Sequence, residues 1–312
     1  MINNQSKIFI AGHKGMLGSP ILRILKKKGY KNLITIEKKK LDLRNQLLVK
    51  NFFEEKKPHA VIIAAAKVGG IKANMNYPAE FIYDNLQIQS NLISTSYNNK
   101  VKKLILFGSS CIYPKNLKKP IKENQMMTGP LEETNDSYSI AKIAGIKMIE
   151  AFNKQYKKRY ICLMPCNLFG PNDNYDANNS HFLPALIKKI YLASKKKKNK
   201  VVKLWGTGKP LREVLYVDEV GEACEYFLRK KTSSHLINIG SHTEKTIKDF
   251  AKKVRKKIDP SVNIKFDNNK KLDGVKRKKL DINLAKKYGW KSKMNFDETL
   301  EMTIEDFKRK YC

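Results

Sequence analysis

Residues 7–18 combine a short apolar run with a glycine-rich turn, and this combination limits the fold more than any other stretch of the chain. The run from Lys7 to Ala11 predicts a buried strand. Gly12, Gly15 and Gly18 follow, and the next apolar residues recur at helical spacing. Glycines allow a tight turn and let a pyrophosphate approach a helix N-terminus, where free N–H groups favour anions. The segment therefore predicts dinucleotide binding, with the spacing G-x-x-G-x-x-G rather than G-x-G-x-x-G.

Strand and helix patterns alternate through the first half of the chain. Apolar runs that predict further strands lie at 33–36, 60–64, 103–107 and 160–165, and helical patterns lie at 46–56, 78–99 and 138–156. This alternation is typical of an α/β fold with a doubly wound parallel sheet of the Rossmann type. The pattern breaks after residue 171. We therefore predict a dinucleotide-binding domain over 1–171 and a smaller C-terminal α/β substrate domain over 172–312, with segments of about 213–242 packing back on the first.

The composition indicates a globular chain, and its charge has two interpretations. The chain has 312 residues, 41% of them hydrophobic, and a formal net charge of +34. Such a charge could indicate a polyanionic partner such as nucleic acid. However, most of the basic residues are lysines in short runs at predicted helix ends and loops, and no nucleic-acid motif accompanies them. These features favour a compositional bias, so we expect no nucleic-acid partner.

Neither the apolar segments nor the cysteines indicate a membrane or metal protein. No apolar run reaches the roughly 18 residues that a membrane span needs, and residues 1–7 lack the apolar region of a signal peptide. The cysteines, at positions 111, 162, 166, 224 and 312, form no CxxC or metal-finger pattern. We therefore expect no metal site, no membrane partner and a reducing, cytoplasmic location.

Tyr138 and Lys142 are the first candidates for chemistry. They are four residues apart on a predicted helix, so their side chains share one face. Beside a nicotinamide, the phenol would donate a proton to a carbonyl oxygen. The ammonium would lower the pKa of the phenol and hydrogen-bond the cofactor ribose. The spacing alone is weak, because many exposed helices carry the same pair.

Polar residues at the ends of predicted strands add further candidates. Ser109, Ser110 and Cys111 follow the apolar run 103–107, and the carboxyl ends of parallel strands face the ligand in such sheets. Cys111 is either a packed, inert thiol or a functional one, and its place in this turn favours function. His181 is an isolated histidine, which is usually structural. It could act chemically only if the fold brings it to Tyr138.

Several strings together resemble the extended short-chain dehydrogenase/reductase family. Gly12-x-x-Gly15-x-x-Gly18, Ser109 and Tyr138-x-x-x-Lys142 are shared by that superfamily. More specific strings are similar to the branch of the family that makes GDP-L-fucose. They are Ala-Ala-Ala-Lys-Val-Gly-Gly-Ile at 64–71, Gly-Ser-Ser-Cys-Ile-Tyr-Pro-Lys at 108–115 and Pro-Leu-Arg-Glu at 210–213. The resemblance covers essentially the whole chain in order.

The resemblance implies an activity and a set of site residues. Members of this branch epimerise GDP-4-keto-6-deoxy-D-mannose at C3 and C5 and reduce C4 with NADPH, and they are typically homodimers. The implied catalytic residues are Tyr138, Lys142, Ser109, Cys111 and His181. The implied NADP(H)-binding residues are Gly12, His13, Lys14, Gly15, Met16, Leu17, Gly18, Lys38, Phe107, Gly108, Ser109, Ser110, Lys142, Pro165, Cys166, Asn167, Leu168 and His181. The implied substrate-binding residues are Lys189, Trp205, Arg212, Asp273 and Lys278.

Three departures from the family pattern concern phosphate recognition, and two rival functions stay open. Lys14 and Lys189 stand where the family often has arginine, and Glu37 precedes Lys38–Lys40 where an arginine is usual. An acid at this point commonly binds the ribose of NAD, whereas basic residues accommodate the phosphate of NADP. The rival functions are a related reductase that makes another GDP-deoxysugar of the colitose type, and a basic, non-catalytic nucleic-acid-binding protein.

Overall fold

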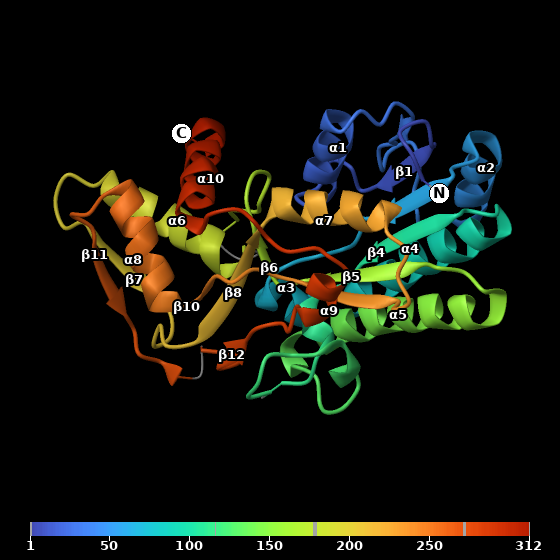
Figure 1. The fold of residues 1–312 in the computed structure, drawn as a ribbon. Coiled ribbons are helices and arrows are strands. Elements are labelled where there is room, and N and C mark those ends of the chain that lie inside the picture. Colours follow the sequence, from blue (N-terminus) through green and yellow to red (C-terminus); the bar gives the residue numbers. More distant parts are fainter. Residues whose placement is uncertain (1, 116, 177–179, 271–272, 312) are drawn as a thin grey trace.

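The computed structural model describes residues 2–115, 117–176, 180–270 and 273–311, and a six-stranded parallel sheet forms its centre (Figure 1). The spatial order of the strands is β2-β1-β3-β4-β5-β9. The bounds are β1 Ile8–Ala11, β2 Leu33–Ile34, β3 Ala60–Ile63, β4 Lys103–Phe107, β5 Ile161–Pro165 and β9 Leu236–Ile239. The direction of strand addition reverses between β1 and β3, which creates a crevice at their carboxyl ends. The predicted doubly wound parallel sheet is confirmed.

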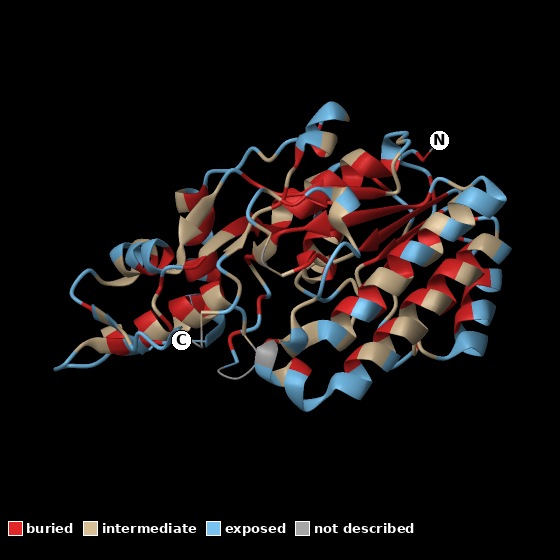
Figure 2. Ribbon diagram, turned by 90° about the horizontal axis from the view of Figure 1, so that it is seen from below, coloured by how far each residue is buried: buried red, intermediate tan, exposed pale blue. Residues whose placement is uncertain are grey.

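Helices cover both faces of this sheet, so its central strands have no solvent-exposed side. On one face α1 (Gly18–Lys27) packs against α7 (Val217–Arg229). On the other, α4 (Pro78–Asn98) packs against α5 (Asp136–Tyr156), with α2 (Gln46–Lys56) beside α4. Every residue of β1, β3, β4 and β5 is buried (Figure 2). This double coverage explains why these strands read as continuous apolar runs rather than alternating ones.

A second, smaller group of elements lies at one end of the main sheet (Figure 1). Its strands are β6 Asn167–Phe169, β7 Val201–Leu204, β8 Leu211–Tyr216, β10 Glu244–Thr246, β11 Asn263–Phe266 and β12 Arg277–Lys278. Its helices are α6 Phe182–Ser194, α8 Ile247–Ile258 and α10 Phe296–Tyr311. Strand β8 pairs with β6, β10 and β12, and β7 pairs with β11. These elements enclose their own hydrophobic core, built around Phe169, Phe250 and Phe296.

The chain returns to the first core twice after leaving it. Helix α7 and strand β9, both from the stretch 213–242, contribute buried side chains to the core of the main sheet. Residues 280–290, which include the short helix α9 (Asn283–Lys287), also join this core through Leu280, Ile282 and Trp290. The sequence did not indicate this second return, because the segment is short and has no clear periodicity.

Three further local features concern strand β12, the cysteines and the lengths of the helices. Within the basic stretch 276–279, Arg277–Lys278 forms β12 by pairing with β8. A two-residue strand carries no detectable pattern of its own, so only its partner reveals it. Cys111, Cys162, Cys166 and Cys224 are free thiols, and Cys312 lies outside the described residues. None of the helices in the described ranges is long and apolar enough to cross a membrane.

Candidate active site

The glycine-rich turn after β1 leaves open space beside the first turn of α1. Gly12 adopts a φ of +86°, and a Cβ there would lie 2.7 Å from the backbone nitrogen of Ala65. A Cβ on Gly18 would overlap the carbonyl group of Gly12. Leu17, the N-cap residue of α1, offers no side-chain cap, so no capping side chain covers the N-terminus of the helix, although the Ser19 N–H group already donates to the Gly15 carbonyl. These features fit an anionic group of a dinucleotide.

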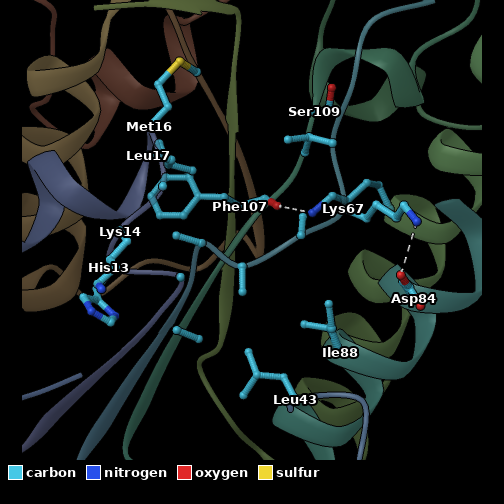
Figure 3. Close-up of a pocket in the computed structure, with 18 of the residues that line it drawn as sticks. His13, Lys14, Met16, Leu17, Leu43, Lys67, Asp84, Ile88, Phe107 and Ser109 are labelled. Carbon is cyan, nitrogen blue, oxygen red and sulfur yellow. Dashed lines mark hydrogen bonds and ion pairs between the residues drawn. The ribbon is translucent and has the colours of Figure 1, made fainter. Parts of the chain in front are cut away.

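A cavity of about 720 Å³ opens at the carboxyl ends of β1, β3, β4 and β5 (Figure 3). Of the residues expected to bind the dinucleotide, only Gly18 does not line it, because Gly18 packs inside the turn. The lining residues that had been expected are Gly12, His13, Lys14, Gly15, Met16, Leu17, Lys38, Phe107, Gly108, Ser109, Ser110, Lys142, Pro165, Cys166, Asn167, Leu168 and His181. The cavity therefore fits a dinucleotide in size and in position.

The cavity also contains residues that the sequence patterns did not single out. Asp42, Leu43 and Arg44 line it from the loop after β2, and Asp84 and Ile88 line it from α4. Figure 3 shows Leu43, Asp84 and Ile88. Arg44 pairs with Asp42 at 2.7 Å and with Asp84 at 3.0 Å, so it ties the loop to the helix across the cavity edge. The position after the second strand of a dinucleotide fold is the signal that could have found this loop.

An ion pair stands at the point where the two cofactor interpretations differ. Lys14 Nζ lies 2.5 Å from Glu37 Oε1. The hydrogen bond and the charge of Lys14 hold the pKa of the Glu37 carboxyl below its usual value. Lys38 and Lys39 line the same part of the cavity. Glu37 therefore pairs with Lys14, one of the basic side chains that could otherwise bind the phosphate group on the ribose of NADP.

Tyr138 and Lys142 lie one turn apart on α5 and both line the cavity. Burial and the nearby Cys111 thiol raise the pKa of the Tyr138 phenol, and a hydrogen bond with Ser109 partly offsets this. Lys142 Nζ donates to the Phe107 carbonyl at 3.0 Å and lies 5.8 Å from the centre of the Tyr138 ring. Burial lowers the pKa of Lys142 to about 8. The pKa of the phenol is thus raised, not lowered as expected, because burial disfavours the phenolate.

Cys111 lies in the 3₁₀ turn η1 (Ser110–Ile112), directly after β4, and its sulfur meets two donors from distant segments. Asn135 Nδ2 is 3.3 Å and Lys278 Nζ 3.5 Å from Sγ, and the Cys111 N–H group donates to Ser109 Oγ at 3.4 Å. Burial alone would raise the pKa of the thiol. The charge of Lys278 and the hydrogen bonds outweigh burial, so the net pKa is lowered. Among the described residues, this sets Cys111 apart from Cys162, Cys166 and Cys224, whose pKa values burial raises.

His181 is the N-cap residue of α6 and lines the same cavity. Its side chain is accessible to solvent, yet the surrounding protein limits its hydration. This desolvation, followed by the charge of Lys278, lowers the pKa of the imidazole below its usual value. The structure therefore brings His181 into the cavity that holds Tyr138 and Cys111, which was the condition for a chemical role.

The five residues expected to bind substrate form a group outside this cavity. Lys189 Nζ lies 4.4 Å from the centre of the Trp205 ring. Arg212 donates to the carbonyl groups of Val275 and Asp273, and the Asp273 carboxylate accepts from Thr207. Lys278 joins this group to the cavity through its contact with Cys111.

The fold and the cavity define the class of this protein. A doubly wound sheet, a glycine-rich turn and a Ser-Tyr-Lys set at the carboxyl ends of the strands are the features of a dinucleotide-dependent enzyme acting on a carbonyl or an alcohol. The chain belongs to the NAD dependent epimerase/dehydratase family, whose model matches residues 8–240.

Individual relatives extend this likeness over the whole chain. GDP-L-fucose synthase 1 of Arabidopsis thaliana is 44% identical over 312 residues, which cover 100% of this chain and 96% of the relative. GDP-L-colitose synthase of Yersinia pseudotuberculosis is 35% identical, over 96% of this chain and 97% of its own. The solved structure of a GDP-mannoheptose C4 reductase from Campylobacter jejuni with NADP bound is 35% identical. It matches with a TM-score of 0.90 over 99% of this chain and 100% of that chain.

Proposed function

We propose that this chain is an NADP-dependent epimerase-reductase that converts GDP-4-keto-6-deoxy-D-mannose into GDP-L-fucose. One observation carries this proposal: a thiol with a lowered pKa, Cys111, shares a cavity with His181 and with the Ser109, Tyr138 and Lys142 set. Ketone reduction needs only Ser109, Tyr138 and Lys142. An additional base and an additional proton carrier are what epimerisation of neighbouring carbons requires. The relative named GDP-L-fucose synthase 1, which matches over nearly its full length, supports this proposal.

In the reductive step, the residues around C4 supply a proton. NADPH, when bound, supplies the hydride. Tyr138 transfers its phenolic proton to the C4 oxygen, and Ser109 hydrogen-bonds that oxygen. Lys142, held by the Phe107 carbonyl, is oriented to bind the cofactor ribose and to support the phenol. The glycine-rich turn and the basic residues Lys14 and Lys38 would hold the phosphate groups.

In the epimerising steps, the C4 ketone makes the neighbouring C–H groups acidic. The Cys111 thiolate takes a proton from C3 or C5, and the electron pair of the broken C–H bond moves onto the C4 oxygen as an enolate. The protonated imidazole of His181 then returns a proton to the opposite face of the same carbon. Cys111 is left as a thiol and His181 as neutral imidazole, so one proton must pass from thiol to imidazole before the next carbon reacts.

The smaller group of elements would hold the rest of the nucleotide sugar. Arg212 offers a planar guanidinium that suits a diphosphate. Trp205 is 68% exposed, so its ring is free to stack on a base or a sugar. Lys189 lies over this ring and adds positive charge beside it. Asp273 and Lys278 complete the group.

Isotope exchange tests the epimerase part of this proposal. The enzyme is incubated in D₂O with GDP-4-keto-6-deoxy-D-mannose and without NADPH. Wild type and Tyr138→Phe should both incorporate deuterium at C3 and C5. Cys111→Ser should not, because an alcohol is a far weaker acid than a thiol and supplies almost no anionic base near neutral pH. If Cys111→Ser exchanges as fast as wild type, Cys111 is only a packed thiol.

Product analysis separates the proposed reaction from its nearest rival. With NADPH present, the sugar product should be GDP-L-fucose. A colitose-type enzyme would act on a 3-deoxy substrate and would release no GDP-L-fucose from the substrate tested. The higher identity to the fucose synthase than to the colitose synthase favours the first outcome.

We further infer a cytoplasmic homodimer with no nucleic-acid partner. Two features support a dimer through α4 and α5: the pairing of these helices on one face of the sheet, and their exposed apolar side chains, such as Tyr83 and Ile140. Light scattering after gel filtration measures the mass directly. Filter binding at physiological salt would detect a nucleic-acid complex.

A further inference from the structure

Three segments that are distant in the sequence converge on one sulfur atom. Cys111 follows β4, Asn135 precedes α5, and Lys278 belongs to β12. The two long-range contacts span 24 and 167 residues along the chain, and both end at Cys111 Sγ. A sulfur atom met by two donors, one of them cationic, is in an arrangement that favours its anionic form.

The position of Lys278 is fixed by the sheet that carries it. Strand β12 pairs with β8 in parallel, so that Lys278 stands opposite Arg212. The neighbouring Arg277 is anchored to both carboxylate oxygens of Glu244, at 2.7 and 2.8 Å. This anchored strand brings the ammonium to the sulfur, and no carboxylate is paired with Lys278 in the described part of the chain.

Asn135 is placed as a helix cap but does not serve as one. It is the N-cap residue of α5, where an asparagine oxygen ordinarily accepts from an N–H group of the first turn. Here no such bond forms. The side-chain amide instead donates to Cys111 Sγ at 3.3 Å, and its oxygen accepts from the Ser139 hydroxyl at 3.4 Å. The helix thus forgoes a side-chain cap, and the amide is directed at the sulfur.

Charged and titratable groups face Cys111 from three elements. Lys278 faces the sulfur from β12 and lowers the pKa of the thiol. Tyr138 faces it from α5 as a neutral phenol, because its own pKa is raised. Burial and then the charge of the same lysine lower the pKa of the His181 imidazole, at the start of α6. In the described part of the chain, Lys278 is therefore the cationic side chain that contacts the sulfur.

We propose that Lys278 and Asn135 are positioning residues that hold Cys111 as an oriented thiolate within the cavity. This role goes beyond the substrate contact expected for Lys278, and only its catalytic consequence rests on the proposed epimerase function. A lysine keeps its charge throughout the reaction, whereas an imidazolium loses its positive charge on giving up a proton. Lys278 therefore stabilises the thiolate whether His181 is protonated or neutral.

The pH dependence of alkylation at Cys111 tests this proposal without substrate or cofactor. Iodoacetamide reacts with the thiolate, and mass spectrometry of the peptide that contains Cys111 follows that residue alone. In Lys278→Met the midpoint of the rate–pH curve should rise by roughly one to two pH units, and in Asn135→Ala by less. Lys278→Arg keeps the positive charge, so its midpoint should lie close to that of wild type. Lys276→Met removes an exposed lysine from the same segment, and its curve should match wild type.

Two outcomes separate this proposal from the proposed function. An unchanged midpoint in both Lys278→Met and Asn135→Ala would overturn the thiolate role. If those variants lose their structure, the pKa of Cys111 can be measured in wild type instead. The difference in thiolate absorbance between wild type and Cys111→Ser is followed as the pH is raised. A pKa at or above that of a free thiol would overturn the thiolate role equally. If the midpoint shifts but wild type exchanges no deuterium with the GDP-keto sugar, the thiolate role stands and the epimerase function fails.

Discussion

At the residue scale, the hydroxyl of Tyr138 is the group on which reduction should depend most. Tyr138→Phe should lower the rate of C4 reduction by roughly 10²- to 10⁴-fold, the usual contribution of a positioned general acid. Dinucleotide affinity should change little, because only the proton donor is removed. Oxidation of NADPH, followed by absorbance, measures the rate. Tyr83→Phe, on the exposed side of α4, is the matched control and should retain wild-type activity; near wild-type turnover in Tyr138→Phe would contradict the assignment.

Cofactor choice should also respond to a single residue, Glu37. We expect NADPH to be preferred over NADH, and Glu37→Gln should strengthen that preference by roughly three- to tenfold, since it frees Lys14 and removes a negative charge near the ribose phosphate. The ratio of kcat/KM for the two cofactors is the measurement. Glu55→Gln, which removes a similar exposed pair with Lys56 on α2, should leave the ratio unchanged. A ratio below one in wild type would mean that Glu37 rather than the lysines decides.

At the element scale, the turn between β1 and α1 should tolerate one glycine change and not another. A Cβ at position 18 meets the Gly12 backbone, which cannot yield, so Gly18→Ala should destabilise the protein by roughly 1–3 kcal/mol and weaken dinucleotide binding. At position 15 the nearest atom to a new Cβ is 3.4 Å away. Gly15→Ala should therefore keep wild-type stability. Thermal unfolding compares the two variants, and equal melting temperatures would contradict the steric account.

The same scale explains which elements the sequence could predict. The helix at 46–56 was predicted with the bounds that the structure has, and Asn45 caps its start by accepting from the Leu48 N–H group at 3.0 Å. Such local capping signals can be recognised from the sequence alone. Strand β12 has none, since it exists only through its pairing with β8. For this reason, the sequence alone could not place Lys278 against Cys111.

At the scale of the whole molecule, the two groups of elements meet at a buried carboxyl, Glu213. It belongs to β8, is 0% exposed, and accepts from the Leu280 N–H group at 2.9 Å. Gly240, at the end of β9, approaches its other oxygen so closely that a Cβ would clash there. Glu213 therefore contacts both the main sheet and the smaller group. Sequence reading gave the resemblance at 210–213, but it could not show this burial.

Because of that burial, Glu213 should make stability depend on pH. Burial raises the pKa of the carboxyl from 4.5 to about 7, and the Leu280 hydrogen bond and the charge of Lys279 only partly oppose it. Below pH 4.5 the group is protonated in both the folded and the unfolded state, and its contribution to stability is complete. As the pH rises from 4.5 to about 7, the unfolded chain releases a proton that the folded chain still holds, so the free energy of unfolding falls, by roughly 3 kcal/mol once both states are ionised.

Denaturant unfolding at pH 5 and pH 8 tests this account. Glu213→Gln is neutral at both pH values, so it should lose the part of the pH dependence that Glu213 causes, and its stability relative to wild type should rise from pH 5 to pH 8. Glu298→Gln, an exposed carboxylate on α10, should follow the wild-type curve. Parallel curves for wild type and Glu213→Gln would show that Glu213 is ionised in the folded protein at both pH values, and that Lys279 compensates its charge more completely than its burial opposes it.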